Sequence, residues 1–383
     1  MVRIVIIGWY GTETIGDRAI LAGIISIIAN IYMDFEIKLG SLYPTLSERT
    51  ILEDYIFLCT SGSKKNISIS IFNSSKVAEL DSAIKWSDIL VMGGGPFMDS
   101  IVELYMIDYA FKRAKKKNKK TAILGCGISS LWHSKLIKPA LSVISNSDIT
   151  IFRDNKSLTT YNKFIKKDIF QCVASIDPAI FAADIFNKRH FKAGEKSKII
   201  SVNFREILDD TYIGVSTSQM FPILSHLLIR LSEQESTREI HLIPMHTFGI
   251  GGDDRYLLNK LSNAIKKKNI HVQNNPLSLE ETMKIYSDSF FCIGMRFHSI
   301  LLQTVLNGKN YIVDYTNPKS GKIVNLLHQL NASGIYKSRY YSLLQPGEQI
   351  FDISNDIVCY SVPEFQINSF RKIYLDKLNE LHI

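Results

Sequence analysis

Apolar residues in the first half of the chain follow two alternating patterns. Short apolar runs, typical of strands buried on both faces, alternate with stretches in which apolar residues recur every three or four positions, as on one face of a helix. The runs predict strands at residues 2–8, 36–42, 69–71, 89–92, 121–124, 149–152 and 170–172. The helical spacings predict helices at 17–31, 76–84, 101–117, 136–144 and from Ser157 onward. This alternation indicates a parallel sheet covered by helices.

The second half repeats the alternation after a polar stretch without periodicity at residues 187–197, which we interpret as a linker. Strands are predicted at 198–202, 239–243, 271–273, 292–294 and 311–313, and helices at 219–234, 254–268, 279–286 and 300–305. A last helix at 364–381 is a candidate for crossing back onto the first domain. We therefore predict two Rossmann-like, doubly wound α/β domains that face a cleft, spanning residues 1–188 and 198–383.

Composition places the chain among ordinary globular proteins. Of its 383 residues, 46% are apolar and 21% are charged. No apolar run reaches the roughly 18 residues that a membrane-spanning helix needs, and the short apolar start carries no cleavage-site pattern, so we expect a cytoplasmic protein. The five cysteines lie far apart without a CxxC pair, as in a reducing compartment. No metal-ligand spacing occurs, and we expect neither a metal nor a cofactor.

The net charge of +8 comes largely from two lysine-rich runs, at residues 112–120 and 266–268. Neither run carries interleaved aromatic residues or a recognition motif, so we do not expect a nucleic-acid partner. An acidic membrane surface or an anionic glycan suits this charge better. Peripheral association with the inner face of the membrane and binding of an anionic glycan are thus both candidate uses of this charge.

The richest chemistry lies in residues 292–322. A short apolar run ends at Gly294, Arg296 and His298 follow, a helical pattern begins, and a second apolar run leads to Lys319 and Lys322. Cations at the carboxyl ends of parallel strands form anion sites, because helix N-termini there add a partial positive charge. The structural alternative is that Arg296 pairs with an acid such as Asp288 or Asp314 and that His298 only caps the helix.

Two further strand ends of the second domain carry basic residues. Arg205 follows the strand at 198–202, and His246 follows the strand at 239–243. Together with Arg296 and His298 they suit a small, strongly anionic molecule, for which phosphoenolpyruvate and a nucleotide diphosphate are both candidates. A surface ion pair with Glu206 is the structural alternative for Arg205.

The first domain carries glycine turns at the ends of its strands. Gly8, Gly11 and Gly16 lie between the first strand and the first helix, where Asp17 caps the helix or orients an acceptor hydroxyl. The spacing is not that of a dinucleotide or P-loop site, which argues against NAD and ATP. Two more glycine turns, at residues 93–95 and 125–127, either line a ligand site or only permit tight turns.

Taken together, the motifs resemble the polysaccharide pyruvyl transferase family. The resemblance covers nearly the whole chain and is strongest in GMRFHSILLQTVLNGK at 294–309. Its other elements are Gly16-Asp17, the triple glycine at 93–95, GCGI at 125–128, RDNKS at 153–157, Asp177-Pro178-Ala179 and PMH at 244–246. The family's first loop usually has Asn where this chain has Thr14.

The resemblance implies a two-domain fold similar to GT-B glycosyltransferases and the transfer of pyruvate from phosphoenolpyruvate, as a ketal, onto a sugar of a surface polysaccharide or its lipid-linked precursor. The donor would bind to the second domain and the acceptor to the first. The residues implied are Arg205, Arg296, Phe297, His298 and Lys319 for the donor, Gly16, Asp17, Gly94, Gly95 and Gly127 for the acceptor, and His298, His246 and Asp17 for catalysis.

Two alternatives remain open at this point. One is a GT-B glycosyltransferase that uses a nucleotide sugar, which would require a ribose-binding acid such as Glu280 or Glu281. The other is a catalytically silent glycan-binding or scaffold protein.

Overall fold

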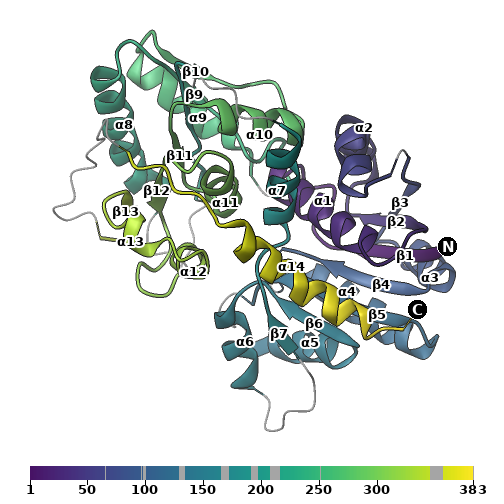
Figure 1. Ribbon diagram of the computed structural model, residues 1–383. Coiled ribbons are helices and arrows are strands. Elements are labelled where there is room, and N and C mark those ends of the chain that lie inside the picture. Colours follow the sequence, from purple (N-terminus) through teal and green to yellow (C-terminus); the bar gives the residue numbers. More distant parts are fainter. Residues whose placement is uncertain are drawn as a thin grey trace. The chain divides into compact units, whose positions relative to one another are not determined.

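The computed structural model describes residues 1–64, 66–95, 97, 101–128, 134–164, 172–190, 197–207, 216–250, 252–345 and 357–382. The chain divides into two compact units. Unit 1 comprises Met1–Glu13, Asp17–Ala182 and Glu364–Ile383, and unit 2 comprises Thr14–Gly16 and Ala183–Pro363. Each unit is built around one parallel sheet (Figure 1).

The sheet of unit 1 has seven strands in the order β3-β2-β1-β4-β5-β6-β7, and every pair is parallel. The strands are β1 (Val2–Ile7), β2 (Phe35–Ser41), β3 (Ile69–Asn73), β4 (Ile89–Gly93), β5 (Lys120–Cys126), β6 (Ile149–Phe152) and β7 (Cys172–Ala174). Strands β4 and β6 are buried along their whole length, as expected for a sheet covered on both faces. The strand order reverses between β1 and β4.

The helices of unit 1 connect these strands. They are α1 (Ile15–Ala29), α2 (Pro44–Ser61), α3 (Val77–Trp86), α4 (Ile101–Lys116), α5 (Ser134–Ser145) and α6 (Asn155–Asn162), and the chain returns in α14 (Glu364–Asn379). Helix α14 packs beside β6, and the hydroxyl of its Tyr374 donates to the carbonyl of Ile176, which follows β7, at 2.6 Å. Helix α7 (Ala179–Arg189) contains the division between the units, so the division lies a few residues before the stretch 187–197 that the sequence suggests as a linker.

Unit 2 contains a parallel sheet of six strands in the order β10-β9-β8-β11-β12-β13. The strands are β8 (Ile199–Val202), β9 (Glu239–Leu242), β10 (Ile270–Val272), β11 (Cys292–Gly294), β12 (Asn310–Asp314) and β13 (Tyr340–Ser342). The helices are α8 (Thr217–Gln234), α9 (Asp254–Ile265), α10 (Leu279–Asp288), α11 (Phe297–Leu306), α12 (Lys322–Gln329) and α13 (Ser333–Tyr336). Apolar residues of the sheet and of α8 and α9 form its core.

Local signals in the sequence fix several helix starts in unit 2. Helices α8 and α10 each begin with a capping box, Ser216 with Gln219 and Ser278 with Glu281. The Asp253 side chain caps α9.

The predicted fold class of two parallel-sheet α/β domains is confirmed. Among the described residues, no helix is long and apolar enough to cross a membrane.

Candidate functional site

The strand order of unit 2 reverses between β8 and β11, and ligands of open α/β sheets bind at the carboxyl ends of the strands at such a point. Asn203, which follows β8, is fully buried and connects three strand ends. Its backbone N–H donates to Ile293 O at 2.8 Å, its Nδ2 donates to Ile243 O at 2.9 Å, and its Oδ1 accepts from Arg296 N at 3.1 Å. The segments that carry Arg205, His246 and Arg296 are thereby held together.

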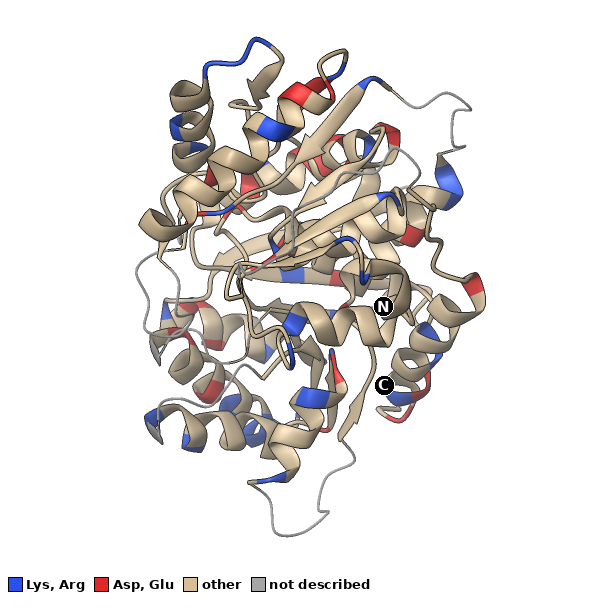
Figure 2. Cartoon of the chain, turned by 90° about the vertical axis from the view of Figure 1, so that its left-hand side faces the viewer, with Lys and Arg blue, Asp and Glu red and all other residues tan. Residues whose placement is uncertain are grey.

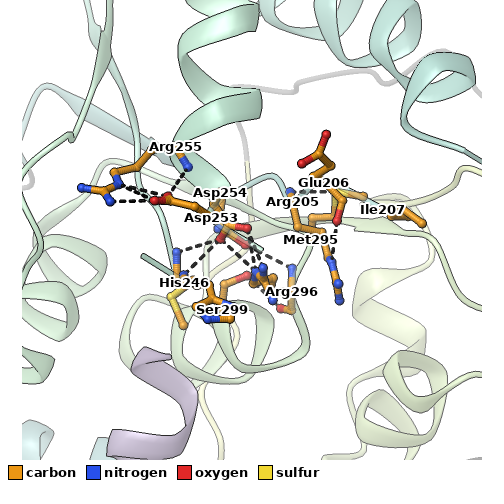
Figure 3. A network of polar contacts seen from close by, with 12 residues as sticks. Arg205, Glu206, Ile207, His246, Asp253, Asp254, Arg255, Met295, Arg296 and Ser299 are labelled. Atoms are coloured by element: carbon orange, nitrogen blue, oxygen red, sulfur yellow. Dashed lines mark hydrogen bonds and ion pairs between the residues drawn. The ribbon is translucent and has the colours of Figure 1, made fainter. Parts of the chain in front are cut away.

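Arg296 forms a bidentate ion pair with Asp254 (Figure 3). Arg296 Nε donates to both carboxylate oxygens, at 3.0 and 2.8 Å, and Nη2 donates to Oδ1 at 2.6 Å. The Asp254 side chain is 1% exposed and that of Arg296 is 16% exposed. The partner acid is therefore Asp254, rather than Asp288 or Asp314. Such a buried pair, with three hydrogen bonds, holds the guanidinium in one orientation.

Asp254 belongs to the site, although the sequence indicates it only as a helix start. Its Oδ2 also accepts from the backbone N–H groups of Met245 and His246, at 3.0 and 3.2 Å. The neighbouring Asp253 has the ordinary capping role, since its carboxylate accepts from the N–H of Arg255. Two consecutive aspartates at a predicted helix start were the available signal, because a helix needs only one cap.

Arg205 lies in the segment that follows β8 and contacts Tyr315, the residue after β12. Arg205 Nη1 donates to the Tyr315 hydroxyl at 3.1 Å, Nε donates to the carbonyl of Glu206 at 3.1 Å, and the guanidinium carbon lies 5.2 Å from the centre of the Tyr315 ring. The hydrogen bond to Glu206 is accepted by its backbone carbonyl. It is therefore a different contact from the ion pair with the Glu206 carboxylate that the sequence suggested.

Tyr315 is surrounded by cations. Its side chain is buried, and the ammonium of Lys322, the first residue of α12, lies 5.4 Å from its ring centre. Burial alone would raise the pKa of Tyr315, but the charges of Lys322 and Arg205, a hydrogen bond with Lys322 and the charge of Arg296 lower it to about 7. Sequence reasoning did not single out Tyr315, because an aromatic residue after a buried strand is indistinguishable from a core residue.

His298 lies in the first turn of α11. Its ring meets that of Phe297 edge to face, with centroids 5.2 Å apart, and Phe297 is buried. The backbone of Gly16, which belongs to unit 2, packs so closely against His298 that a Cβ at position 16 would overlap the imidazole. Gly16 is therefore required by this contact, and not by a special backbone angle.

His246 follows β9 and is buried. It forms an isolated antiparallel bridge with Thr14, and its carbonyl accepts from Asp254 N at 3.0 Å. The neighbouring Ile15 N donates to Met245 O at 3.0 Å. Thr14 occupies the position at which the family usually has Asn. The residue that differs from the family pattern is therefore the one that pairs with His246.

Lys319 lies in the loop between β12 and α12 and is exposed. Its backbone N–H donates to Asn317 Oδ1 at 2.9 Å, as in a tight polar turn. Of the two lysines that the sequence suggests, Lys322 is the one beside Tyr315.

The residues expected on the acceptor side are in unit 1, apart from Gly16. Asp17 is half-buried in the first turn of α1. Gly94 and Gly95 have positive φ values of 69° and 78°, which glycine adopts without strain. A Cβ at Gly127 would collide with the guanidinium of Arg153. Turn geometry and packing thus account for these glycines whether or not they contact a ligand.

Among the described residues, no group of three or more His, Cys, Asp or Glu side chains is arranged to hold a metal ion.

The sequence profile of the family described as polysaccharide pyruvyl transferase matches residues 15–317. No functionally curated protein matches the sequence significantly.

Solved structures with the same fold include several nucleotide-sugar enzymes. A protein of Anabaena, Alr3699/HepE, solved in complex with UDP and glucose, has a TM-score of 0.58 at 12% identity, with 100% of this chain and 99% of that chain covered. The UDP-GlcNAc 2-epimerase of Neisseria meningitidis has a TM-score of 0.53 at 10% identity, with 99% and 100% covered. That of Methanocaldococcus jannaschii has a TM-score of 0.55 at 10% identity, with 98% and 93% covered. These likenesses identify a GT-B fold.

Proposed function

Because the chain belongs to the polysaccharide pyruvyl transferase family, a class of enzymes, we propose that it transfers pyruvate from phosphoenolpyruvate onto a sugar of a surface polysaccharide or its precursor, where the pyruvate forms a ketal. The observation that carries this proposal is the pair of arginines, Arg205 and Arg296, which follow β8 and β11, the two strands between which the strand order reverses. His298 lies in the first turn of the helix that follows Arg296. These groups match a small molecule that bears both a carboxylate and a phosphate.

The ion pair with Asp254 prepares Arg296 for such a ligand. Asp254 occupies the Nε and Nη2 edge, and among the described residues no other side chain bonds to this guanidinium. The Nη1 amino group would then hold the donor. A guanidinium fixed in advance loses little conformational freedom on binding, which favours affinity. Arg205 would hold the second anionic group of phosphoenolpyruvate, with Phe297 contributing its backbone and Lys319 further positive charge.

The reaction proceeds by acid catalysis. An acid, with His298 the first choice and His246 the second, protonates C3 of the enol, and positive charge develops at C2. One acceptor hydroxyl attacks C2, phosphate leaves, and a second hydroxyl of the same sugar closes the ketal. The two acceptor hydroxyls release two protons in total. One of them restores the acid that protonated C3, and the other ends on the released phosphate. The arginines stabilise the negative charge of the departing phosphate.

We assign the acceptor sugar to Gly16, Asp17 and the glycine turns at Gly94, Gly95 and Gly127. Asp17 would orient the attacking hydroxyl and accept its proton. Gly16, the residue before Asp17, packs against the imidazole of His298, the proposed acid.

Transfer of a sugar from a nucleotide sugar is less well supported. The similar structures solved with UDP or UDP-GlcNAc share only the fold with this chain, at 10–12% identity. The two acids that could hold a ribose are engaged elsewhere. Glu281 closes the capping box of α10, and Glu280 Oε1 contacts Arg189 Nη1 at 3.2 Å and His190 Nε2 at 2.9 Å. A ribose would have to displace one of these contacts.

An acidic membrane surface would bring the enzyme to a lipid-linked acceptor. A shallow groove of about 680 Å³ lies between α4 and α5 in unit 1, lined by Tyr105, Asp108, Lys112, Lys135, Lys138, Pro139 and Ser142. Tyr105 is 51% exposed, and Figure 2 shows basic and acidic residues interspersed along the described helices. Lys112 pairs with Asp108 at 2.6 Å, and the exposed Lys135 and Lys138, which line the groove with Tyr105, fit an anionic lipid surface. This groove supports the proposal that the enzyme associates peripherally with the cytoplasmic face of the membrane.

Product analysis tests the proposed reaction. The full chain is incubated with phosphoenolpyruvate and a panel of bacterial glycans and lipid-linked oligosaccharides, and released phosphate and the mass of each acceptor are measured. We expect acceptor-dependent phosphate release together with an acceptor that has gained a pyruvate ketal. Transfer from a UDP, GDP or CMP sugar, with none from phosphoenolpyruvate, would assign the enzyme to the glycosyltransferases instead.

A further inference from the structure

Tyr315, Arg205 and Lys322, which we name the Tyr315 cluster, lie at the carboxyl edge of the second sheet. Tyr315 directly follows β12, which pairs with β11, the strand that leads to Arg296 and His298. The Tyr315 hydroxyl accepts from Arg205 Nη1 at 3.1 Å, and the ammonium of Lys322 is 5.4 Å from the ring centre. Two cations therefore lie beside the Tyr315 side chain, Arg205 on its hydroxyl and Lys322 near its ring.

The negative groups close to this cluster have other partners. Asp254 forms its bidentate pair with Arg296. Asp314, next to Tyr315, accepts from the Tyr340 hydroxyl at 2.5 Å and from Thr316, and burial raises its pKa. The groups that act on Tyr315 from neighbouring elements are thus the cations Arg205, Arg296 and Lys322. A buried tyrosine in such surroundings favours its charged form despite its burial.

We infer that the Tyr315 hydroxyl is the internal anion of the donor site: deprotonated, it balances Arg205 and Lys322 when no ligand is bound, and it takes up a proton when a phosphate-bearing ligand binds there. The inference rests on the proposed function for the identity of that ligand, and it adds Lys322 and Tyr315 to the residues that bind the donor. The arriving phosphate takes the hydrogen bond of Arg205, and the proton that solvent supplies converts the phenolate into a phenol.

The pKa of Tyr315, about 7, determines how the affinity for the anion changes with pH. Above this pH the phenolate must gain a proton before the anion can bind, so affinity falls as pH rises from about 7 toward the ordinary tyrosine value near 10. Below about pH 7 Tyr315 is already neutral, and its contribution to the pH dependence disappears. In Tyr315→Phe no proton is needed, so this dependence should be absent.

A first experiment needs no ligand. Tyrosinate ultraviolet absorbance is followed against pH for the wild type and for Tyr315→Phe. We expect one tyrosine of the wild type to ionise near neutral pH and this signal to be missing in the variant. Lys322→Gln should move the midpoint upward, whereas Lys268→Gln, a matched change in an exposed lysine before β10, should leave it unchanged. Identical curves for the wild type and Tyr315→Phe below about pH 9 would overturn the inference.

A second experiment adds the anions themselves at about pH 8, first inorganic phosphate and then phosphoenolpyruvate. Each is expected to reduce the tyrosinate signal and, in calorimetry in buffers of different ionisation heat, to take up close to one proton per bound anion. Tyr315→Phe should bind with no such uptake. A response to phosphate but not to phosphoenolpyruvate would contradict the proposed function and leave the inference standing. Binding of either anion with the tyrosinate signal intact would refute the inference.

Discussion

Asp254 accepts three hydrogen bonds from the guanidinium of Arg296 while its Oδ2 also accepts the backbone N–H groups of Met245 and His246. The carboxylate therefore joins the chain after β9 to the arginine after β11. One residue at the start of α9 thus determines both the orientation of Arg296 and the path of the segment that carries His246.

Replacing Asp254 with Asn should be costly. It leaves the mostly buried charge of Arg296 without its partner, for which we expect a loss of about 3 kcal/mol in the free energy of unfolding. Denaturant unfolding measures this loss. Asp81→Asn is a matched control, because Asp81 forms a similar bidentate pair with Arg113 but at 27% and 37% side-chain exposure, where about 1 kcal/mol or less is expected. Equal losses in the two variants would contradict the role given to Asp254.

His298→Ala should lower turnover roughly 10²-fold or more if His298 is the acid. His246→Ala, measured in the same assay, tests the second choice. His271→Ala serves as the control, because His271 lies on β10, where it pairs with Glu239. Wild-type turnover in His298→Ala would remove that residue from the proposed mechanism.

Gly16→Ala should impair activity, because the new methyl group would overlap the imidazole of His298 and force it to move. Gly334→Ala is the matched control, since a Cβ there meets nothing within 4 Å. Turnover and circular dichroism of both variants separate the displacement of His298 from general unfolding. Gly16→Ala with normal turnover would mean that the position of His298 is not critical for the reaction.

Most strands could be predicted from the sequence, because strands buried on both faces appear as continuous apolar runs. The run at 89–92 corresponds to β4 and that at 149–152 to β6. Helix α2 was not predicted, because serines and threonines occupy several of its buried positions and weaken its apolar periodicity. Strand β13 was not predicted either, because its sequence, two half-buried tyrosines followed by a serine, does not form an apolar run.

The candidate site was predictable only where a residue type itself suggests chemistry. Arg296 and His298 stand out in an apolar context, and the structure brings Arg296 to the sheet edge that the pattern indicates. Asp254 and Tyr315 were missed because their importance comes from partners far away in the sequence, 42 residues in the case of Asp254 and 110 in the case of Tyr315. Periodicity reports the face on which a residue lies, but it does not report which strand ends meet.

The lysines of the groove between α4 and α5 should govern binding to acidic membranes. Changing Lys112, Lys135 and Lys138 to Gln removes one lysine that Asp108 partly balances and two others worth about 1 kcal/mol each near an anionic surface, so binding should weaken about 30-fold or more. Cosedimentation with phosphatidylserine or phosphatidylglycerol vesicles measures the change. The control replaces Lys260, Lys268 and Lys337, exposed lysines of unit 2, with Gln. Equal weakening in both triple variants would indicate a response to net charge alone.

We propose that this enzyme binds phosphoenolpyruvate through Arg205 and Arg296. Thermal unfolding in the presence of phosphoenolpyruvate tests this binding most directly. Phosphoenolpyruvate at about 100 times its dissociation constant stabilises the folded protein by about 2.7 kcal/mol, which should raise the unfolding temperature by a few degrees. We predict this rise for the wild type, its loss in Arg205→Ala and Arg296→Ala, and no comparable rise with UDP, GDP or CMP sugars. A rise with a nucleotide sugar and none with phosphoenolpyruvate would contradict the account.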